Sequence, residues 1–293
     1  MSSSERIFVI GGTGNIGTKA VKDLLDNGVR VTLFARNPDK VKSLFSKIEL
    51  INIVQGDYND LSPLKEGLKG HTRLFVVLGE SKQFVELKKT IADYAFDAGI
   101  QQLVDLSSFS VNLGYRSSES GSEHYYGERA IYDHPERRGH VVMLRPGRFM
   151  SNTFWVDRVK STGKLFDALP PSFGQDWISP NDVGAIAAVI LQEDMEKHGD
   201  AVYSLVGDVI SSQERAAIFS RVLGQEISYQ EITPAQKYHT LVEHGLSHQL
   251  AFMLSDPLLC AESQRITPAI EILLGRKPET FEQFLEANKQ SIQ

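Results

Sequence analysis

The chain is poor in cysteine, in long hydrophobic runs and in positive charge, and each shortage excludes a class of protein. Its 1 cysteine, Cys260, excludes an internal disulfide and a zinc site built from several cysteines. The longest apolar run, residues 183–191, is about half of the roughly 18–20 residues that a membrane-spanning helix needs. Residues 1–6 pass from serines directly into charged side chains, so no secretion signal is indicated. We therefore expect a cytoplasmic protein in a reducing compartment.

Acidic residues outnumber basic ones. The chain has 37 aspartates and glutamates against 31 lysines and arginines, a formal net charge of -6, and the two signs are interspersed. Nucleic acids and anionic membranes bind concentrated basic surfaces, so we expect neither as a direct partner. The 41% of hydrophobic residues and the 23 glycines are ordinary for a globular protein with a sizeable core.

Between residues 6 and 144, short β-branched apolar runs alternate with amphipathic stretches. This rhythm is typical of βα units on a parallel sheet, and nearly continuous hydrophobic strands indicate a sheet that is covered on both faces. The apolar spacing predicts a helix over 16–25 and another over 84–99. The expected strands are 7–10, 30–34, 50–54, 74–78, 103–106 and 141–144.

The rhythm changes after residues 145–147. Pro170, Pro171 and Pro180 punctuate a segment that we expect to be irregular, and an apolar helix then begins at 180 or 181. A strand near 202–206, a helix that begins near 211–214 and a strand near 227–232 follow. The serine-rich segment 117–122 is expected to be a loop.

A glycine-rich turn lies between the first strand and the first helix. In this context Gly11 allows the tight turn, Gly14 lets the backbone approach a pyrophosphate, and Gly17 lets helix and strand pack closely. The free N–H groups at the helix start favour phosphate binding, although a glycine-rich turn can also exist without a ligand. The predicted contacts to a dinucleotide come from Gly11, Thr13, Gly14, Asn15, Ile16 and Gly17.

The end of the second strand indicates which dinucleotide binds. A site for NAD usually has a carboxylate there, which binds the ribose 2′-hydroxyl, whereas a site for NADP has a cation. Here Arg36 follows the strand and Lys40 comes one helical turn later, so both can contact a 2′-phosphate. The alternative is a surface arginine paired with Asp39. We expect NADP(H) as the cofactor.

Further short motifs follow in a specific order: Gly-Asp at 56–57, then segments 103–108, 144–147, 177–183 and 203–207. With the glycine-rich turn they make nearly the whole chain resemble the NmrA-like group of atypical short-chain dehydrogenase/reductases. The resemblance implies that Asp57 lies near adenine, Leu78 and Gly79 beside the middle of the cofactor, and Ser107 and Ser108 near the nicotinamide. Each of these residues could equally have an ordinary structural role.

Residues 123–129 are similar to a His-x-x-x-Glu-Lys stretch of the triphenylmethane reductase and quinone reductase branch. Ordinary short-chain dehydrogenases use Tyr-x-x-x-Lys, in which the lysine lowers the pKa of the tyrosine. Here Ala130 follows Tyr126 at that spacing, and Arg129 follows Tyr125. Arg129 can hold a ribose hydroxyl or stabilise a phenolate, but it stays charged and does not shuttle protons. The catalytic candidates on this helix are His124, Tyr125 and Tyr126.

No metal site is expected. His244 and His248 share a helical spacing, but a zinc site would need a third ligand, and Gly245 weakens a helix between them. The aromatic residues between 149 and 177 suit either packing of the C-terminal part or a pocket for a flat hydrophobic ligand.

These observations predict an α/β fold, a doubly wound parallel sheet of the Rossmann type with a smaller C-terminal α/β lobe. Residues 1–150 are expected to form the NADP-binding domain, and 151–293 a substrate-binding lobe interleaved with the last sheet strands. The expected activity is NADPH-dependent hydride transfer to a small conjugated or aromatic acceptor, such as a quinone, dye, enone or imine. One alternative is a non-enzymatic NADP(H) sensor with a protein partner. Another is a biosynthetic enzyme that keeps the cofactor as a scaffold.

Overall fold

A parallel sheet of seven strands forms the centre of the protein, in the order β10-β6-β5-β4-β1-β2-β3. The structure is a computed structural model that describes residues 6–79, 81, 83–114, 116–257 and 265–293, so Cys260 lies outside the described residues. All neighbouring strands in this sheet run parallel. The strands are β1 (Ile7–Ile10), β2 (Val31–Ala35), β3 (Ile51–Gln55), β4 (Arg73–Val76), β5 (Gln102–Leu106), β6 (His140–Pro146) and β10 (Val202–Leu205).

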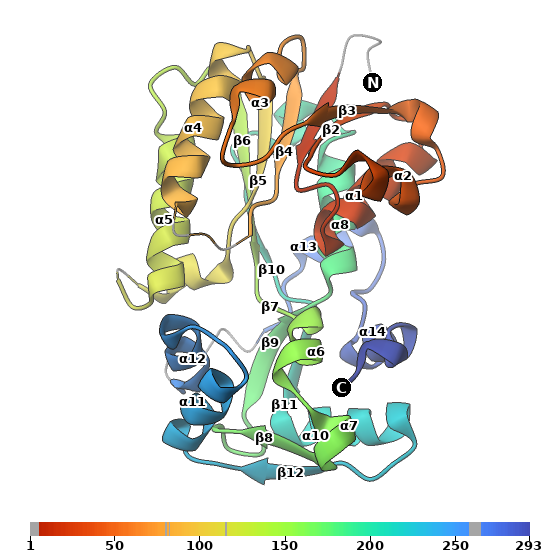
Figure 1. The fold of residues 1–293 in the computed structure, drawn as a ribbon, viewed down its shortest axis with the longest axis vertical. Helices are drawn as coiled ribbons and strands as arrows, with labels where there is room; N and C mark the ends of the chain where they lie inside the picture. The colour runs from red at the N-terminus through yellow and green to blue at the C-terminus, as the bar shows by residue number, and fades with distance from the viewer. Residues whose placement is uncertain (1–5, 80, 82, 115, 258–264) are drawn as a thin grey trace.

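Helices cover both faces of this sheet (Figure 1). One hydrophobic core lies under α1 (Asn15–Asp26), α2 (Pro38–Leu44), α8 (Pro180–Ile190) and α13 (Ala269–Leu274). The other lies under α3 (Ser62–Gly67), α4 (Phe84–Asp97) and α5 (Glu119–Tyr132). Because both faces are covered, the residues of β1, β2, β4 and β5 are all buried. The doubly wound fold that the sequence predicts is therefore confirmed.

The second half of the chain contributes a helix and a strand to the layers built by the first half. Helix α8 packs on α1, where a Cβ at Gly184 would lie 2.6 Å from the carbonyl oxygen of Ile16 and 2.7 Å from the Cβ of Lys19. The two helices approach this closely because residue 184 has no side chain. Strand β10 then adds to the sheet beside β6.

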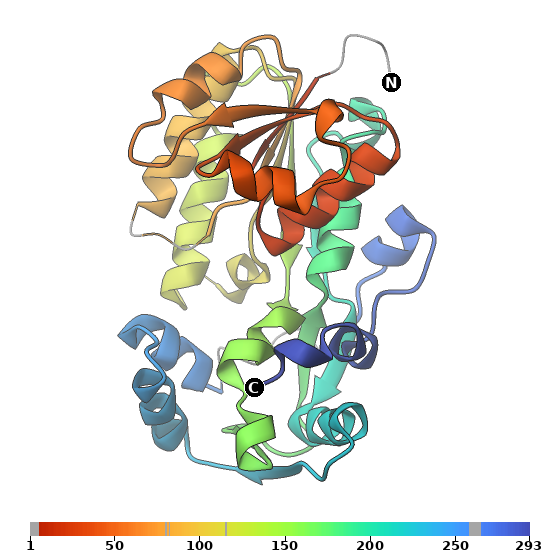
Figure 2. The ribbon, with the colours of Figure 1, turned by 45° about the vertical axis from the view of Figure 1, so that its right-hand side comes forward.

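The remaining residues form a smaller lobe below the sheet (Figures 1 and 2). Its strands are β7 (Arg148–Phe149), β8 (Lys164–Asp167), β9 (Gly174–Ile178), β11 (Asp208–Ser211) and β12 (Ser228–Glu231). Its helices are α6 (Thr153–Val156), α7 (Val159–Thr162), α10 (Ser212–Leu223), α11 (Pro234–Glu243), α12 (His248–Ser255) and α14 (Phe281–Ala287). Helix α9 (Met195–His198) instead lies beside β6 of the large sheet, where Glu196 Oε1 is 3.1 Å from His140 Nε2. Short 3-10 turns occur at Ile48–Leu50, Phe109–Leu113, Met150–Asn152 and Lys289–Ser291.

Three local expectations were wrong. The segment expected to be irregular contains β8 and β9, which pair with the distant strands β12 and β11 and so lack a local hairpin signal. The serine-rich segment begins α5, because Ser118 Oγ accepts a hydrogen bond from the N–H of Gly121 at 3.0 Å and caps the helix. Strand β4 ends at Val76, before Leu78, because its neighbour β1 ends where Gly11 turns away with φ +79.

A charged cluster lies inside the lobe. Asp167 Oδ1 is 2.5 Å from Lys237 Nζ, and its Oδ2 is 3.4 Å from Arg215 Nη1. Arg215 also pairs with Asp157 and lies over the ring of Trp177. Burial alone would raise the pKa of Asp167, but the charges of Lys237 and Arg215 outweigh it and hold that pKa at about 2. The cluster thus joins α6, β8, α10 and α11. Throughout the described residues, no helix is both long and apolar enough to cross a membrane.

Candidate functional site

The glycine-rich turn connects β1 to α1 in a conformation that side chains would not allow. A Cβ at Gly11, where φ is +79, would lie 2.2 Å from the carbonyl oxygen of Val77. A Cβ at Gly17 would lie 2.3 Å from the carbonyl oxygen of Gly11. The turn therefore fits tightly between its own helix and the end of β4, next to the point where the strand order reverses from β1 to β4.

Helix α1 begins with free N–H groups. Its N-cap is Gly14, and within the described residues no side chain caps it and no acidic residue lies in its first turn. Thr13 is half-buried, Gly14 and Asn15 are exposed, and Ile16 is buried against the core. A helix start with this geometry attracts an anion, because its N–H groups and dipole point outward. The residues present fit a diphosphate.

Arg36 and Asp57 lie at the carboxyl ends of adjacent strands, β2 and β3. Both Arg36 and Lys40 are exposed, and Asp39 pairs with Lys42 at 3.2 Å rather than with Arg36. In the part of the chain that the structure describes, the Arg36 guanidinium group makes no ion pair. The Asp57 carboxylate accepts a hydrogen bond from the N–H of Asn59 at 2.8 Å, which fixes the turn after β3. Arg36 and Lys40 are thus exposed cations that form no ion pair within the described residues.

Leu78 and Gly79 after β4, and Ser107 and Ser108 after β5, lie together at the carboxyl edge of the sheet. All four line one cavity of about 390 Å³ between the sheet and the lobe. Ser108 Oγ is held by the N–H of Ser110 at 3.2 Å and by its hydroxyl at 2.8 Å. Ser107 is 3% exposed, and its Oγ finds no hydrogen-bond partner among the described residues. Ser107 therefore has unused hydrogen-bonding capacity at the wall of the cavity.

Most of the cavity wall is apolar or aromatic. Phe84 comes from α4, Phe149 from β7 and Trp155 from α6, while Leu250 and Met253 come from α12. An adjoining hollow of about 700 Å³ shares Leu250 and Met253 with the cavity. Because the walls come from both the sheet and the lobe, the pair of hollows accommodates a flat hydrophobic molecule beside the nucleotide end.

His124 is the catalytic candidate that lines this cavity. Its ring packs edge-on against Phe84 at 4.8 Å, and its Nδ1 has no hydrogen-bond partner in the described part of the chain. Burial, and after it the charge of Lys88, lower the pKa of His124 to about 3. The imidazole is therefore neutral near pH 7.

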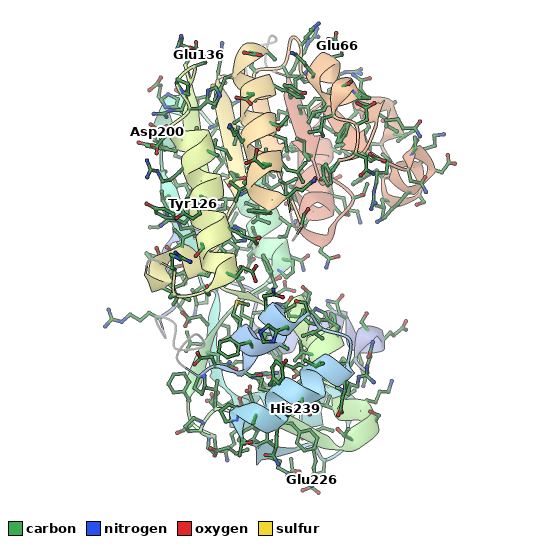
Figure 3. The ribbon with its side chains drawn as sticks, turned by 60° about the vertical axis from the view of Figure 1, so that its left-hand side comes forward. Glu66, Tyr126, Glu136, Asp200, Glu226 and His239 are labelled. Carbon is green, nitrogen blue, oxygen red and sulfur yellow. The ribbon has the colours of Figure 1, made fainter. Side chains whose placement is uncertain are left out.

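Tyr125, Tyr126 and Arg129 lie on the outer side of α5, away from the cavity. Tyr126 is 42% exposed and Tyr125 37%, and they line a separate hollow of about 190 Å³; Figure 3 shows Tyr126 on that outer side. Hydrogen bonds with Asp133 and then Tyr125 raise the pKa of Arg129. The structure thus separates these three residues from His124.

The structure joins two of the sequence motifs through a buried contact. Glu128 on α5 receives two hydrogen bonds from the guanidinium group of Arg145 on β6, from Nε at 2.8 Å and from Nη2 at 2.5 Å. Arg145 Nη1 also donates to Asn112 Oδ1 at 3.0 Å. This contact fixes α5, and with it His124, against the end of β6.

Sequence reasoning missed two parts of the site. One is the ion pair between Lys88 and Asp105, in which Nζ and Oδ2 are 2.6 Å apart and both side chains are 0% exposed. Two features of the sequence could have indicated this pair: a single acidic residue, Asp105, in an apolar strand, and Lys88, four residues after Phe84 on the buried side of a helix. The other is α12, which is far in sequence from the nucleotide motifs, so no local pattern indicated that it contributes to the site.

The fold defines a doubly wound α/β protein of the Rossmann type. The chain belongs to the NmrA-like family, whose model matches residues 3–285. It is 28% identical to a (4-alkanoyl-5-oxo-2,5-dihydrofuran-3-yl)methyl phosphate reductase of Streptomyces griseus subsp. griseus, with 94% of this chain and 95% of that one covered. It is 24% identical to an NAD(P)H azoreductase of Xenophilus azovorans, over 96% and 97%. The NADPH complex of an Escherichia coli quinone oxidoreductase superposes with a TM-score of 0.83 at 22% identity, over 97% and 99%.

Proposed function

We propose that this protein is an NADPH-dependent reductase that transfers hydride to a small conjugated or aromatic acceptor. The observation that carries the proposal is the cavity at the carboxyl edge of the sheet, with a mostly apolar wall in which Ser107 Oγ and His124 Nδ1 have no hydrogen-bond partner among the described residues. Reductases among the similar proteins support the reaction class.

Residues 1–150 bind the nucleotide in this proposal. The turn at Gly11 and the N–H groups at Gly14 and Asn15 hold the diphosphate, and Arg36 with Lys40 selects the 2′-phosphate. Asp57 lies beside adenine, Leu78 and Gly79 lie beside the middle of the cofactor, and Ser107 and Ser108 lie near the nicotinamide. NADPH, once bound, supplies the hydride. The chain contributes proximity, because it holds donor and acceptor side by side in a cavity from which most water is excluded.

Residues 151–293 supply the acceptor side, together with α5. Trp155, Leu250 and Met253 pack on a flat ring, and His124 and Ser107 donate hydrogen bonds to an oxygen of the acceptor. Because His124 is neutral, it stabilises the negative charge that develops on this oxygen without giving up a proton. The proton that completes the reduced product comes from water. A quinone or an enone satisfies both donors.

The test is the oxidation of NADPH by the full-length protein with a panel of acceptors: a quinone, an azo dye, a triarylmethane dye, an enone and an imine. We expect NADPH oxidation to depend on at least one acceptor, with the quinone or enone fastest. A redox sensor would instead bind NADP+ and NADPH with different affinities and turn over none of the panel. A biosynthetic enzyme that retains its cofactor would convert a substrate with no net loss of NADPH.

A further inference from the structure

The ion pair between Lys88 and Asp105 lies directly beneath the acceptor cavity. Lys88 comes from α4 and Asp105 from β5, and the Lys88 ammonium group also donates to the carbonyl oxygen of Leu106 at 3.1 Å. Burial, only partly offset by the charge of Lys88, raises the pKa of Asp105 to about 6. Above about pH 6 the Asp105 carboxyl is ionised, so its ion pair with Lys88 is a fixed dipole in a region of low dielectric constant.

The ammonium group of this pair contacts residues that form the cavity wall. Lys88 Nζ lies 4.7 Å from the ring centre of Phe84, and that ring lies 4.8 Å from the ring of His124. Phe84, Leu106 and His124 line the cavity, whereas Lys88 and Asp105 do not. The ammonium group is therefore one layer of side chains away from the cavity, and its charge helps to lower the pKa of His124.

Stability alone does not account for the pair. Removing two charges from water costs free energy that their attraction often fails to recover, so an apolar pair of similar volume would serve the core at least as well. Asp105 Oδ1 also lacks a hydrogen-bond partner among the described residues. Buried charges with perturbed pKa values gather at functional sites, and this pair adjoins one.

We propose that Lys88, held by Asp105, is a positioning residue for the electrostatics of the acceptor site, and that the dipole stabilises negative charge on an oxygen bound at His124 and Ser107. The inference rests on the proposed function, because it takes the cavity as the acceptor site. It also gives that site a charge preference: an acceptor whose oxygen becomes anionic is favoured over a cationic one.

Other charged groups surround the same cavity and stay in place in the variants below. The charged groups are Glu123 from α5, Arg148 from β7, and the paired Glu128 and Arg145; the titratable His124 on α5 is neutral near pH 7. Their contribution is common to every protein compared, so a difference between variants reports the Lys88–Asp105 dipole.

The experiment measures the pKa of 4-nitrophenol bound to the full-length protein without NADPH, so that no turnover is involved. The phenolate absorbs in the visible range, and its fraction against pH gives the bound pKa directly. In the wild type we expect this pKa to lie below its value in water. In the double variant Lys88→Met/Asp105→Asn it should rise by about one pH unit, a tenfold loss of preference for the anion.

Two single variants separate electrostatics from packing. Asp105→Asn keeps a hydrogen-bond acceptor for Lys88 and removes the compensating charge, so it should not raise the bound pKa. Lys88→Gln removes the cation and should raise the bound pKa. If the double variant does not fold, this single variant is the test. If the ion pair had only a structural role, the two single variants would shift the bound pKa in the same direction. Lys89→Met, the same kind of change at the exposed neighbouring residue, is the matched control.

If the bound pKa is unchanged in Lys88→Gln and in the double variant, the Lys88–Asp105 dipole does not stabilise the bound anion, and the inference is wrong. If acceptors are still turned over with NADPH, only this inference fails and the proposed function stands. If 4-nitrophenol does not saturate the wild type and no acceptor is turned over, the cavity is not an acceptor site and both fail.

Discussion

Lys237 on α11 and Asp167 on β8 form an ion pair inside the lobe, with Nζ 2.5 Å from Oδ1. Helices α11 and α12 form a hairpin with a small core of their own around Leu241 and Leu254. Because α12 carries one wall of the cavity between sheet and lobe, the pair ties that wall to the strands of the lobe. A contact inside the lobe thus helps to set the shape of this cavity.

Replacing Lys237 with methionine should lower the free energy of unfolding by about 3 kcal/mol, because a buried carboxylate then loses its closest partner. Urea unfolding at pH 7 measures the change. Lys164→Met, at an exposed lysine on the same strand as Asp167, should stay within about 0.5 kcal/mol of the wild type. Equal effects of the two substitutions would show that the ion pair does not secure the hairpin.

Asp167 should contribute to the acid limit of stability. Its pKa in the folded protein is about 2, and the unfolded value is about 3.9. Since the folded value is the lower one, the contribution is fully present above about pH 4 and is lost as the pH falls through 2. The total is about 2–3 kcal/mol. Asp167→Asn should flatten the fall in stability between pH 4 and 2, measured by urea unfolding, whereas Asp39→Asn, at an exposed residue, should leave the slope intact.

Gly11→Ala should abolish measurable NADPH binding, because the added Cβ would collide with the carbonyl oxygen of Val77. Gly28→Ala is a fair comparison, since Gly28 also has positive φ but nothing within 4 Å of its added Cβ. It should cost about 1 kcal/mol of stability and leave binding unchanged. Calorimetry with NADPH measures both. If Gly11→Ala kept its affinity for NADPH, the turn would not be part of the nucleotide site.

Arg36→Ala should weaken NADPH binding by about ten- to a hundredfold and leave NADH binding nearly unchanged, because only NADPH carries the 2′-phosphate that a guanidinium group can hold. Titration of both nucleotides measures the ratio. Arg30→Ala removes an exposed arginine at the other end of β2, where its side chain bonds the Glu49 carbonyl oxygen, and should change neither affinity. An equal loss for both nucleotides would argue against selection by Arg36.

His124→Phe should lower kcat/KM for a quinone by about a hundredfold, because the acceptor oxygen loses a hydrogen-bond donor in a dry site. Tyr126→Phe should stay within about twofold, since its hydroxyl lies on the outer side of α5. Steady-state rates at saturating NADPH give both values. A larger loss in Tyr126→Phe than in His124→Phe would place the chemistry on the other side of this helix.

The sequence by itself determined the sheet, the helix after β1 and the nucleotide-binding candidates. Strand after strand is apolar, and the turn from Gly11 to Gly17 depends on local geometry, so both can be read from neighbouring residues. The expected ends of the first strand and of the apolar helix at 180 agree closely with β1 and α8.

Only the tertiary structure decided which side chains share the cavity at the carboxyl edge of the sheet. Along α5 the sequence offered His124, Tyr125 and Tyr126 equally, but adjacent residues of a helix point in different directions, and packing against α4 turned His124 inward. Lys88 and Asp105 met because α4 lies on β5, a contact that no local pattern records. Residues that are distant in sequence meet through the packing of whole elements, and that packing becomes visible only when the chain is folded.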